Sequence, residues 1–226
     1  MQLFYCPDIS STPILPIDEA RHCIKVLRKK TGDTIDIIDG KGNLYKAEIT
    51  NDNFKKCEII ITNTVTNFDK RKRFLHIAIS PTKNIDRIEW FVEKAVEIGV
   101  DEISFILTNN SERRNLKLDR IEKKAISAMK QSIKATLPII NKLISFEEFI
   151  RNCKNKQRFI AHLENDPKNL TTFKLDSNIC LLIGPEGGFI KEEIKRAKLK
   201  NFTPTLLGNS RLRTETAGIV SCTILN

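Results

Sequence analysis

The second part of the chain alternates short apolar runs with stretches of helical spacing. The apolar runs predict strands at residues 75–79, 103–107, 159–163, 179–183 and 204–207. Helical periodicity predicts helices at residues 84–98, 119–135 and 146–153, and two consecutive acidic residues, Glu192 and Glu193, predict the start of a further helix. Strands separated by helices favour a mostly parallel sheet with helices on both faces.

The first part of the chain shows the pattern of a small β domain. Strands are expected from Leu3 and at 34–38, 44–50 and 57–65, with helical spacing over 18–28. Asp39-Gly40 between two apolar segments is a strong hairpin signal. A compact barrel of this size often presents one face to RNA. The basic run 70–73, either a phosphate contact or a solvated linker, is the expected boundary between domains of residues 1–70 and 71–226.

Two stretches near the C-terminus each predict a buried strand that stops abruptly before a helix. Gly184, Gly187 and Gly188 follow the apolar run 179–183, and Gly208 follows the run 204–207. Ligands of parallel sheets bind beyond the carboxyl ends of the strands, so both stretches predict one pocket with walls of backbone. The first loop lacks the ending of a P-loop and the spacing of a dinucleotide fingerprint, and a purely structural turn is the alternative.

The composition points to a polyanionic partner. The 226 residues carry a net charge of +10, which favours nucleic acid or an acidic membrane surface, although a solvated basic surface gives the same excess. Six scattered cysteines form no Cys-x-x-Cys pair, so no metal site is expected. Neither a signal peptide nor an apolar run of roughly 20 residues is present, and we expect a reduced cytoplasmic protein.

Polar side chains also follow the predicted strand ends. Arg113 and Arg114 come after the strand that ends at residue 107, where they could bind phosphate, neutralise charge on a base, or belong to a solvated loop. Arg213 and Glu215 flank a predicted helix start and could form a surface pair or hold a substrate or a neighbouring subunit.

Taken together, these residues resemble the SPOUT-class methyltransferases that modify the N3 atom of a uridine in small-subunit ribosomal RNA (the RsmE family). The resemblance covers nearly the whole chain. Two C-terminal motifs carry most of its specificity: Ile-Gly-Pro-Glu-Gly-Gly-Phe at 183–189, and Leu-Gly at 207–208 with Leu-Arg-Thr-Glu-Thr-Ala at 212–217. Two positions differ from many members, because Ser210-Arg211 replaces an arginine followed by an aliphatic residue and Lys134 replaces an arginine.

The resemblance implies a fold, a cofactor and an assembly. An N-terminal PUA-like small β-barrel would help to bind RNA, and a C-terminal SPOUT α/β domain would contain a trefoil knot. S-adenosylmethionine would bind in the knot, and the protein would be a homodimer. The implied cofactor-binding residues are Leu182, Ile183, Gly184, Glu186, Gly187, Leu207, Gly208, Leu212 and Thr216, and the implied RNA-binding residues are His22, Lys25, Arg28, Arg114 and Arg211.

The implied reaction is methylation of N3 of a specific uridine in 16S ribosomal RNA, with free RNA or the assembled small subunit as substrate and no metal or membrane. Arg113 and Arg213 are the candidate cations for the charge that develops on the base, and Glu215 or a water is the candidate proton acceptor. Two alternatives remain: another SPOUT activity such as ribose 2′-O methylation, and a non-catalytic RNA-binding factor in ribosome assembly.

Overall fold

The computed structural model describes residues 1–163 and 167–226, which form two compact units. The first unit comprises residues 1–70 and 126–137, and the second comprises residues 71–125 and 138–226. The first stretch of the first unit ends at residue 70, at the start of the basic run 70–73. The segment 126–137, which the sequence pattern assigned to the second domain, belongs to the first unit instead.

The first unit is built on a sheet that has four strands among the described residues, in the order β1–β2–β3–β4. The strands are β1 (Leu3–Tyr5), β2 (Thr34–Ile38), β3 (Leu44–Asn51) and β4 (Glu58–Val65). β1 runs parallel to β2, and the other neighbours are antiparallel. The predicted helix over 18–28 is split into α1 (Ile17–Arg21) and the π-helical turn η1 (His22–Val26). Arg28 lies in the left-handed region (φ 57°), which no α-helix can include.

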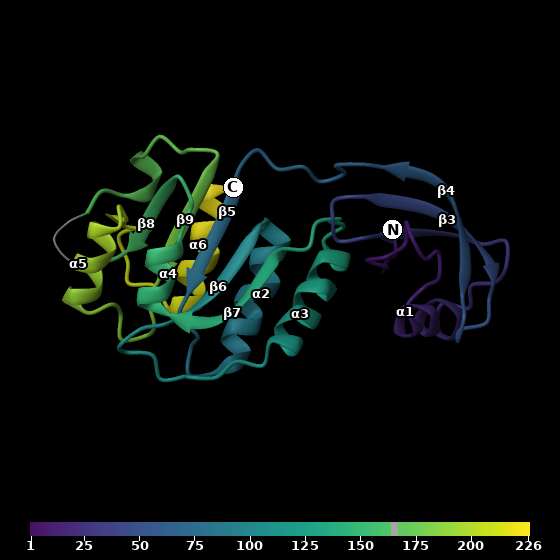
Figure 1. The fold of residues 1–226 in the computed structure, drawn as a ribbon, viewed down its shortest axis with the longest axis horizontal. Helices are drawn as coiled ribbons and strands as arrows, with labels where there is room; N and C mark the ends of the chain where they lie inside the picture. Colours follow the sequence, from purple (N-terminus) through teal and green to yellow (C-terminus); the bar gives the residue numbers. More distant parts are fainter. Residues whose placement is uncertain (164–166) are drawn as a thin grey trace. The chain divides into compact units, whose positions relative to one another are not determined.

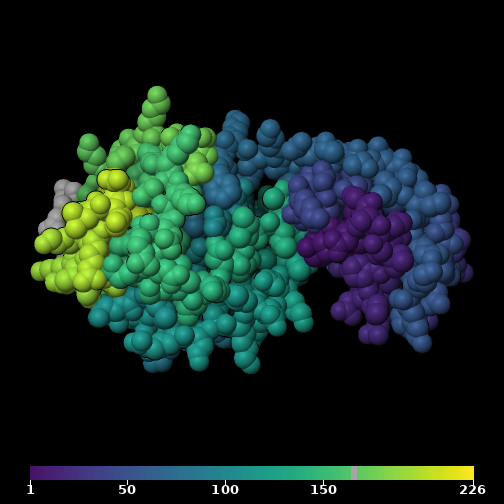
Figure 2. Space-filling view, in the orientation of Figure 1, coloured from purple at the N-terminus to yellow at the C-terminus, as the bar shows by residue number. Residues whose placement is uncertain are grey.

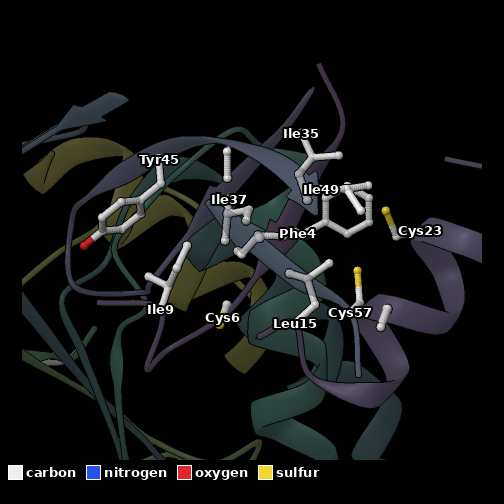
Figure 3. Packing of buried hydrophobic residues seen from close by; sticks show 13 residues of the cluster. Phe4, Cys6, Ile9, Leu15, Cys23, Ile35, Ile37, Tyr45, Ile49 and Cys57 are labelled. Atoms are coloured by element: carbon white, nitrogen blue, oxygen red, sulfur yellow. The ribbon is translucent and has the colours of Figure 1, made fainter. Parts of the chain in front are cut away.

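One hydrophobic cluster fills the interior of the first unit. Figure 3 shows side chains from the N-terminal segment, β2 and β3 converging, with Phe4, Ile37 and Ile49 among them. Each of these three side chains is essentially inaccessible to solvent. Cys23 and Cys57 lie at one side of the same cluster. The period-2 alternation of β3 therefore turns one face inward and leaves the polar face outside.

The second unit contains, within the described residues, a six-stranded sheet in which every neighbouring pair is parallel. The order is β10 (Thr203–Thr205), β8 (Gln157–Ala161), β9 (Asn178–Ile183), β5 (Phe74–Ile79), β6 (Glu102–Leu107) and β7 (Ile139–Ser145). The predicted parallel α/β architecture is confirmed. β7 was not predicted, because Asn141 and Lys142 interrupt its apolar run, and an edge strand tolerates polar side chains that a central strand does not.

Helices cover both faces of this sheet (Figure 1). α2 (Ile85–Ile98) and α6 (Thr214–Leu225) pack together, and α6 also contacts β5 and β9. α4 (Phe146–Asn152) and α5 (Lys191–Leu199) pack into the cluster on the opposite face. Figure 2 gives the same view with every atom drawn, coloured by residue number. A short 3₁₀ turn, Leu170–Thr172, follows β8. α3 (Leu118–Gln131) ends before the predicted residue 135, because Ile133 adopts a left-handed φ of 56°.

Candidate active site

A pocket of about 360 Å³ opens at the carboxyl ends of β8, β9 and β10. The first residues of α6 form part of its wall. Its lining consists of Ala161, His162, Leu163, Ile183, Gly184, Pro185, Glu186, Gly187, Gly188, Phe189, Thr205, Leu206, Leu207, Gly208, Ser210, Arg211, Leu212, Thr214 and Ala217. The volume suits a small organic molecule, and glycine and aliphatic residues predominate in the wall. The two glycine stretches therefore meet in one pocket, as their positions after parallel strands predicted.

Glycine backbone shapes this pocket. Gly188 has a φ of 69° and Gly208 a φ of 154°, and a Cβ at either position would meet no atom within 4 Å, so both border open space. Gly184 is more confined, because a Cβ there would lie 3.2 Å from two ring carbons of Phe189. A ligand can thus approach the main chain closely at Gly188 and Gly208.

Hydrogen bonds tie together the loops that follow β5, β6 and β9. Arg113 donates from Nε to the carbonyl oxygen of Thr82 (3.1 Å) and from Nη2 to that of Lys83 (2.5 Å). The Lys83 amide donates to Oε1 of Glu186 (3.2 Å). Asn110 Nδ2 donates to the carbonyl oxygens of Gly187 (3.2 Å) and Gly188 (3.1 Å). These bonds fix the shape of the rim beside the pocket.

The N-terminus of α6 is held against the β9 loop. The hydroxyl of Thr214, a buried residue, donates to the carbonyl oxygen of Gly184 at 3.0 Å. Glu215 is only 5 % exposed, and its Oε1 lies 3.8 Å from Nε of Arg87. Its Oε2 has no hydrogen-bond partner among the described residues. Arg213 is the exposed residue that precedes the helix.

The predicted cofactor residues fall into two groups. Seven line the pocket: Ile183, Gly184, Glu186, Gly187, Leu207, Gly208 and Leu212. Leu182 lies outside the lining, because strand alternation turns it into the core cluster beneath α4 and α5. Thr216 is half-buried on α6 and also lies outside the lining.

The predicted cations take different positions. Arg211 lines the pocket, and its Nη2 lies 3.5 Å from the carbonyl oxygen of Glu186. Arg113, Arg213 and Glu215 are not part of the lining. Arg114 is exposed in the β6 loop. Next to these arginines, the Glu112 carboxylate accepts a hydrogen bond from Lys83 and raises the pKa of that ammonium group.

Sequence reasoning missed several wall residues, including Phe189, Thr214 and Ala217. Thr214 had a usable signal, because it opens the helix that follows the second glycine stretch. Phe189 and Ala217 end the two motifs of the resemblance, but nothing in the local sequence pattern showed that their side chains form part of the wall.

In the first unit, basic side chains gather around an aromatic ring. The Arg21 guanidinium lies 5.9 Å and the Lys25 ammonium 5.2 Å from the centre of the Phe54 ring. His22 is half-buried, with Nε2 3.4 Å from Nε2 of Gln2, and Arg28 is exposed. The predicted RNA contacts Lys25 and Arg28 are thus on the surface of this unit.

Within the described part of the chain, no helix combines the length and apolar character required to cross a membrane. Residues 1–163 and 167–226 also contain no group of three or more His, Cys, Asp or Glu side chains arranged to bind a metal ion.

Comparisons with known proteins agree with this architecture. Residues 69–226 match the RNA methyltransferase domain family, and residues 15–62 match the RNA methyltransferase PUA domain family. The ribosomal RNA small subunit methyltransferase E of Mesomycoplasma hyopneumoniae is 33% identical over 201 residues, which cover 87% of this chain and 86% of the relative.

Solved structures give the same result. A probable rRNA methyltransferase from Porphyromonas gingivalis is 41% identical, with a TM-score of 0.92 over 98% of this chain and 95% of the other. A ribosomal RNA small subunit methyltransferase E from Neisseria gonorrhoeae, bound to S-adenosylmethionine, is 28% identical with a TM-score of 0.88 over 98% and 95% of the two chains. The chain therefore belongs to the RNA methyltransferase family that includes ribosomal RNA small subunit methyltransferase E.

Proposed function

We propose that this protein transfers the methyl group of S-adenosylmethionine to N3 of a uridine in 16S ribosomal RNA. The observation that supports this most directly is the glycine-walled pocket at the carboxyl ends of β8, β9 and β10. The Neisseria relative binds S-adenosylmethionine, and the Mesomycoplasma relative is named for the small ribosomal subunit. The net charge of +10 suits an RNA substrate.

The pocket fits this cofactor in size and chemistry. Backbone groups at Ile183, Gly184, Leu207, Gly208 and Leu212 would hold the cofactor, and the open space beside Gly188 and Gly208 lets a ligand approach the main chain. The cofactor would supply an electrophilic methyl group. Aliphatic side chains in the wall would exclude water from the reacting centre.

The chain's own charged groups would act on the base. Loss of the N3 proton leaves negative charge on the uracil ring, and a fixed cation stabilises that charge. Arg213 and Arg113 are our candidates for this role. Arg113 already donates to two backbone carbonyls of the β5 loop, so part of its effect would be to position that loop. Glu215, buried with one unpartnered oxygen among the described residues, is the candidate proton acceptor.

Arg213→Ala is expected to lower the methylation rate with bound RNA by about a hundredfold, the usual effect of removing one charge-stabilising donor. The affinity for the cofactor should remain unchanged, because Arg213 lies outside the pocket lining.

Arg113→Ala should reduce both the methylation rate and the affinity for the cofactor, since it also releases the β5 loop. Single-turnover assays and cofactor titrations separate the two effects. Arg151→Ala removes an exposed positive charge on α4 and serves as the control. Near-normal turnover in both variants would contradict the electrostatic role.

RNA would also contact the first unit. Lys25 and Arg28 are exposed there, and Arg21 and Lys25 lie over Phe54. Basic side chains around an aromatic ring suit contacts to phosphate and to unpaired bases. His22, Arg114 and Arg211 complete the proposed set of RNA contacts.

We place the reaction in the cytoplasm. We also expect the chain of the second unit to form a knot around the segment that joins β9 to α6.

We further propose that the protein is a homodimer. α2 and α6 pack together, and both carry apolar side chains that the chain itself leaves partly uncovered. Trp90 on α2 is 46% exposed, and Ile219, Val220 and Ile224 on α6 are half-buried. An α-helix with apolar residues on most of its circumference is usually buried on more than one side. A second copy of this chain would cover this surface.

Trp90→Glu is expected to convert the dimer into a monomer, because a carboxylate would be desolvated in the interface. Light scattering of the purified protein measures the mass directly. Leu199→Glu is the matched control: Leu199 is 75% exposed on α5, which covers the other face of the sheet, and its replacement should leave the dimer intact. A Trp90→Glu protein that keeps the wild-type mass would exclude this surface as the interface.

Product analysis tests the reaction itself. Methylated 16S RNA is digested to nucleosides and analysed by mass spectrometry against N3-methyluridine and 2′-O-methyluridine standards. N3-methyluridine is expected. The 2′-O-methyl nucleoside would identify another SPOUT activity. Binding of RNA without either product would favour a non-catalytic role.

A further inference from the structure

A second pocket, of about 500 Å³, lies in the second unit near the amino ends of β5, β6 and β9. It is separate from the proposed cofactor pocket, with which it shares no lining residue. Its wall combines hydrogen-bonding side chains with one thiol: His76, Ser104, Asn141, Cys153, Asn155 and Asn178. The proposed methyl transfer uses none of these residues.

The thiol in this wall has a second thiol next to it. Cys153 follows the last residue of α4, is half-buried and lines the pocket. Cys180 lies within β9, is fully buried and packs in the same core cluster as Cys153. β9 places Cys180 beside His76 of β5, and Nδ1 of His76 lies 3.2 Å from Oδ1 of Asn155. The S–H of Cys153 points to the same Asn155 oxygen at 3.4 Å. An accessible thiol and a buried thiol therefore pack in the same cluster around this pair of side chains.

The surroundings make the two thiols unequal. Interaction with the Cys180 side chain is the largest cause that lowers the pKa of Cys153, which falls to about 7. A hydrogen bond from the Asn155 backbone and the positive charge of Arg158 also lower it. Burial and the Glu102 carboxylate raise the same pKa but do not outweigh these effects. Burial raises the pKa of Cys180 well above its ordinary value. Burial also lowers the pKa of His76, which contacts Asn155 and Glu102, so this imidazole is neutral near pH 7. At that pH a large fraction of Cys153 is thiolate, while Cys180 keeps its proton.

We propose that Cys153 and Cys180 form an oxidisable dithiol, in which the sulfur of Cys153 attacks hydrogen peroxide that enters the pocket and Cys180 then closes an intramolecular disulfide. In the first step the Cys153 sulfur bonds to one peroxide oxygen, the O–O bond breaks, and the other oxygen leaves as water, which gives a sulfenic acid. In the second step the Cys180 sulfur displaces the hydroxyl group from Cys153, and a second water leaves. The two thiols lose two electrons and two protons, and the peroxide is reduced to two waters.

The first unit supplies an internal control. Cys23 and Cys57 also neighbour each other and share a cluster (Figure 3), but both are fully buried. Burial raises the pKa of Cys23 to about 12, and it also raises the pKa of Cys57. Neighbouring thiols without pocket access or thiolate character should resist the same oxidant.

The test treats the purified full chain with hydrogen peroxide and follows it by intact mass and peptide mapping. The expected product has lost two hydrogen atoms and links the Cys153 peptide to the Cys180 peptide. Cys180→Ser should stop at the sulfenic acid on Cys153, which a 1,3-dicarbonyl reagent traps. Cys153→Ser should form neither product at these positions. No link in the wild type, or a Cys23–Cys57 link formed equally fast, would overturn the proposal.

A second measurement needs no variant. The rate of alkylation of each cysteine by iodoacetamide is measured against pH in the native protein. Cys153 should react fastest, with a midpoint near pH 7, whereas Cys6, Cys23, Cys57, Cys180 and Cys222 should stay largely unmodified. A Cys153 that reacts no faster than these five would contradict the proposal. The result is independent of whether the protein methylates RNA.

Discussion

Gly184→Val is expected to weaken the binding of S-adenosylmethionine by at least about a hundredfold, or about 2.7 kcal/mol. A Cβ at this position would lie 3.2 Å from two carbons of the Phe189 ring and 3.4 Å from the carbonyl carbon of Gly188. Valine adds two further methyl groups, and its branched side chain restricts the backbone as well. The loop cannot move away freely, because the Gly184 carbonyl accepts the hydrogen bond from Thr214.

Calorimetric titration of the purified protein measures this effect. Ile183→Val is the matched control, because it removes one methylene from the neighbouring wall residue and should change the affinity only a few-fold. Wild-type affinity in Gly184→Val would place the cofactor elsewhere. If neither protein binds the cofactor alone, the titration is repeated with RNA present, since the site would then be completed by the substrate.

The sequence pattern predicted the parallel sheet because buried strands and amphipathic helices alternate with clear periods. It failed where tertiary context overrides the local pattern. β7 carries Asn141 and Lys142 in an edge strand, so its apolar signal is too short to recognise. The end of α3 depends on the left-handed backbone of Ile133, a conformation that an apolar β-branched residue rarely adopts.

The pocket could be predicted from its glycines, since they mark places where backbone borders a ligand. Its side-chain wall could not. Ala217, for example, reaches the pocket only because α6 packs back against β9. The sequence also does not predict hydrogen bonds between loops. It predicted that Arg113 follows β6, but not that Arg113 donates to two backbone carbonyls of the β5 loop.

The second large effect is expected from Gly218→Ala, which changes the packing of α6. A Cβ on Gly218 would lie 2.5 Å from Cε2 and 2.6 Å from Cδ2 of Phe91, and 3.2 Å from Cδ1 of Ile79. Gly218→Ala should improve helix propensity by about 1 kcal/mol. Overpacking of a filled core costs up to about 3 kcal/mol and occasionally more, and contacts this short lie at the upper end. We therefore expect a net destabilisation of about 2 kcal/mol.

The effect should extend to the pocket, because α6 cannot shift away from Phe91 without moving Thr214 relative to Gly184. Chemical denaturation measures the free energy of unfolding. Cofactor titration measures how much the displacement of Thr214 from Gly184 weakens binding. Thr223→Ala, on the exposed side of the same helix, should change neither by much. Adding Phe91→Leu to Gly218→Ala should restore part of both, since it removes the ring that the new methyl group meets. A Gly218→Ala protein more stable than the wild type would mean that helix propensity outweighs packing here, and that the contact between α2 and α6 can widen without affecting the loop that α6 supports.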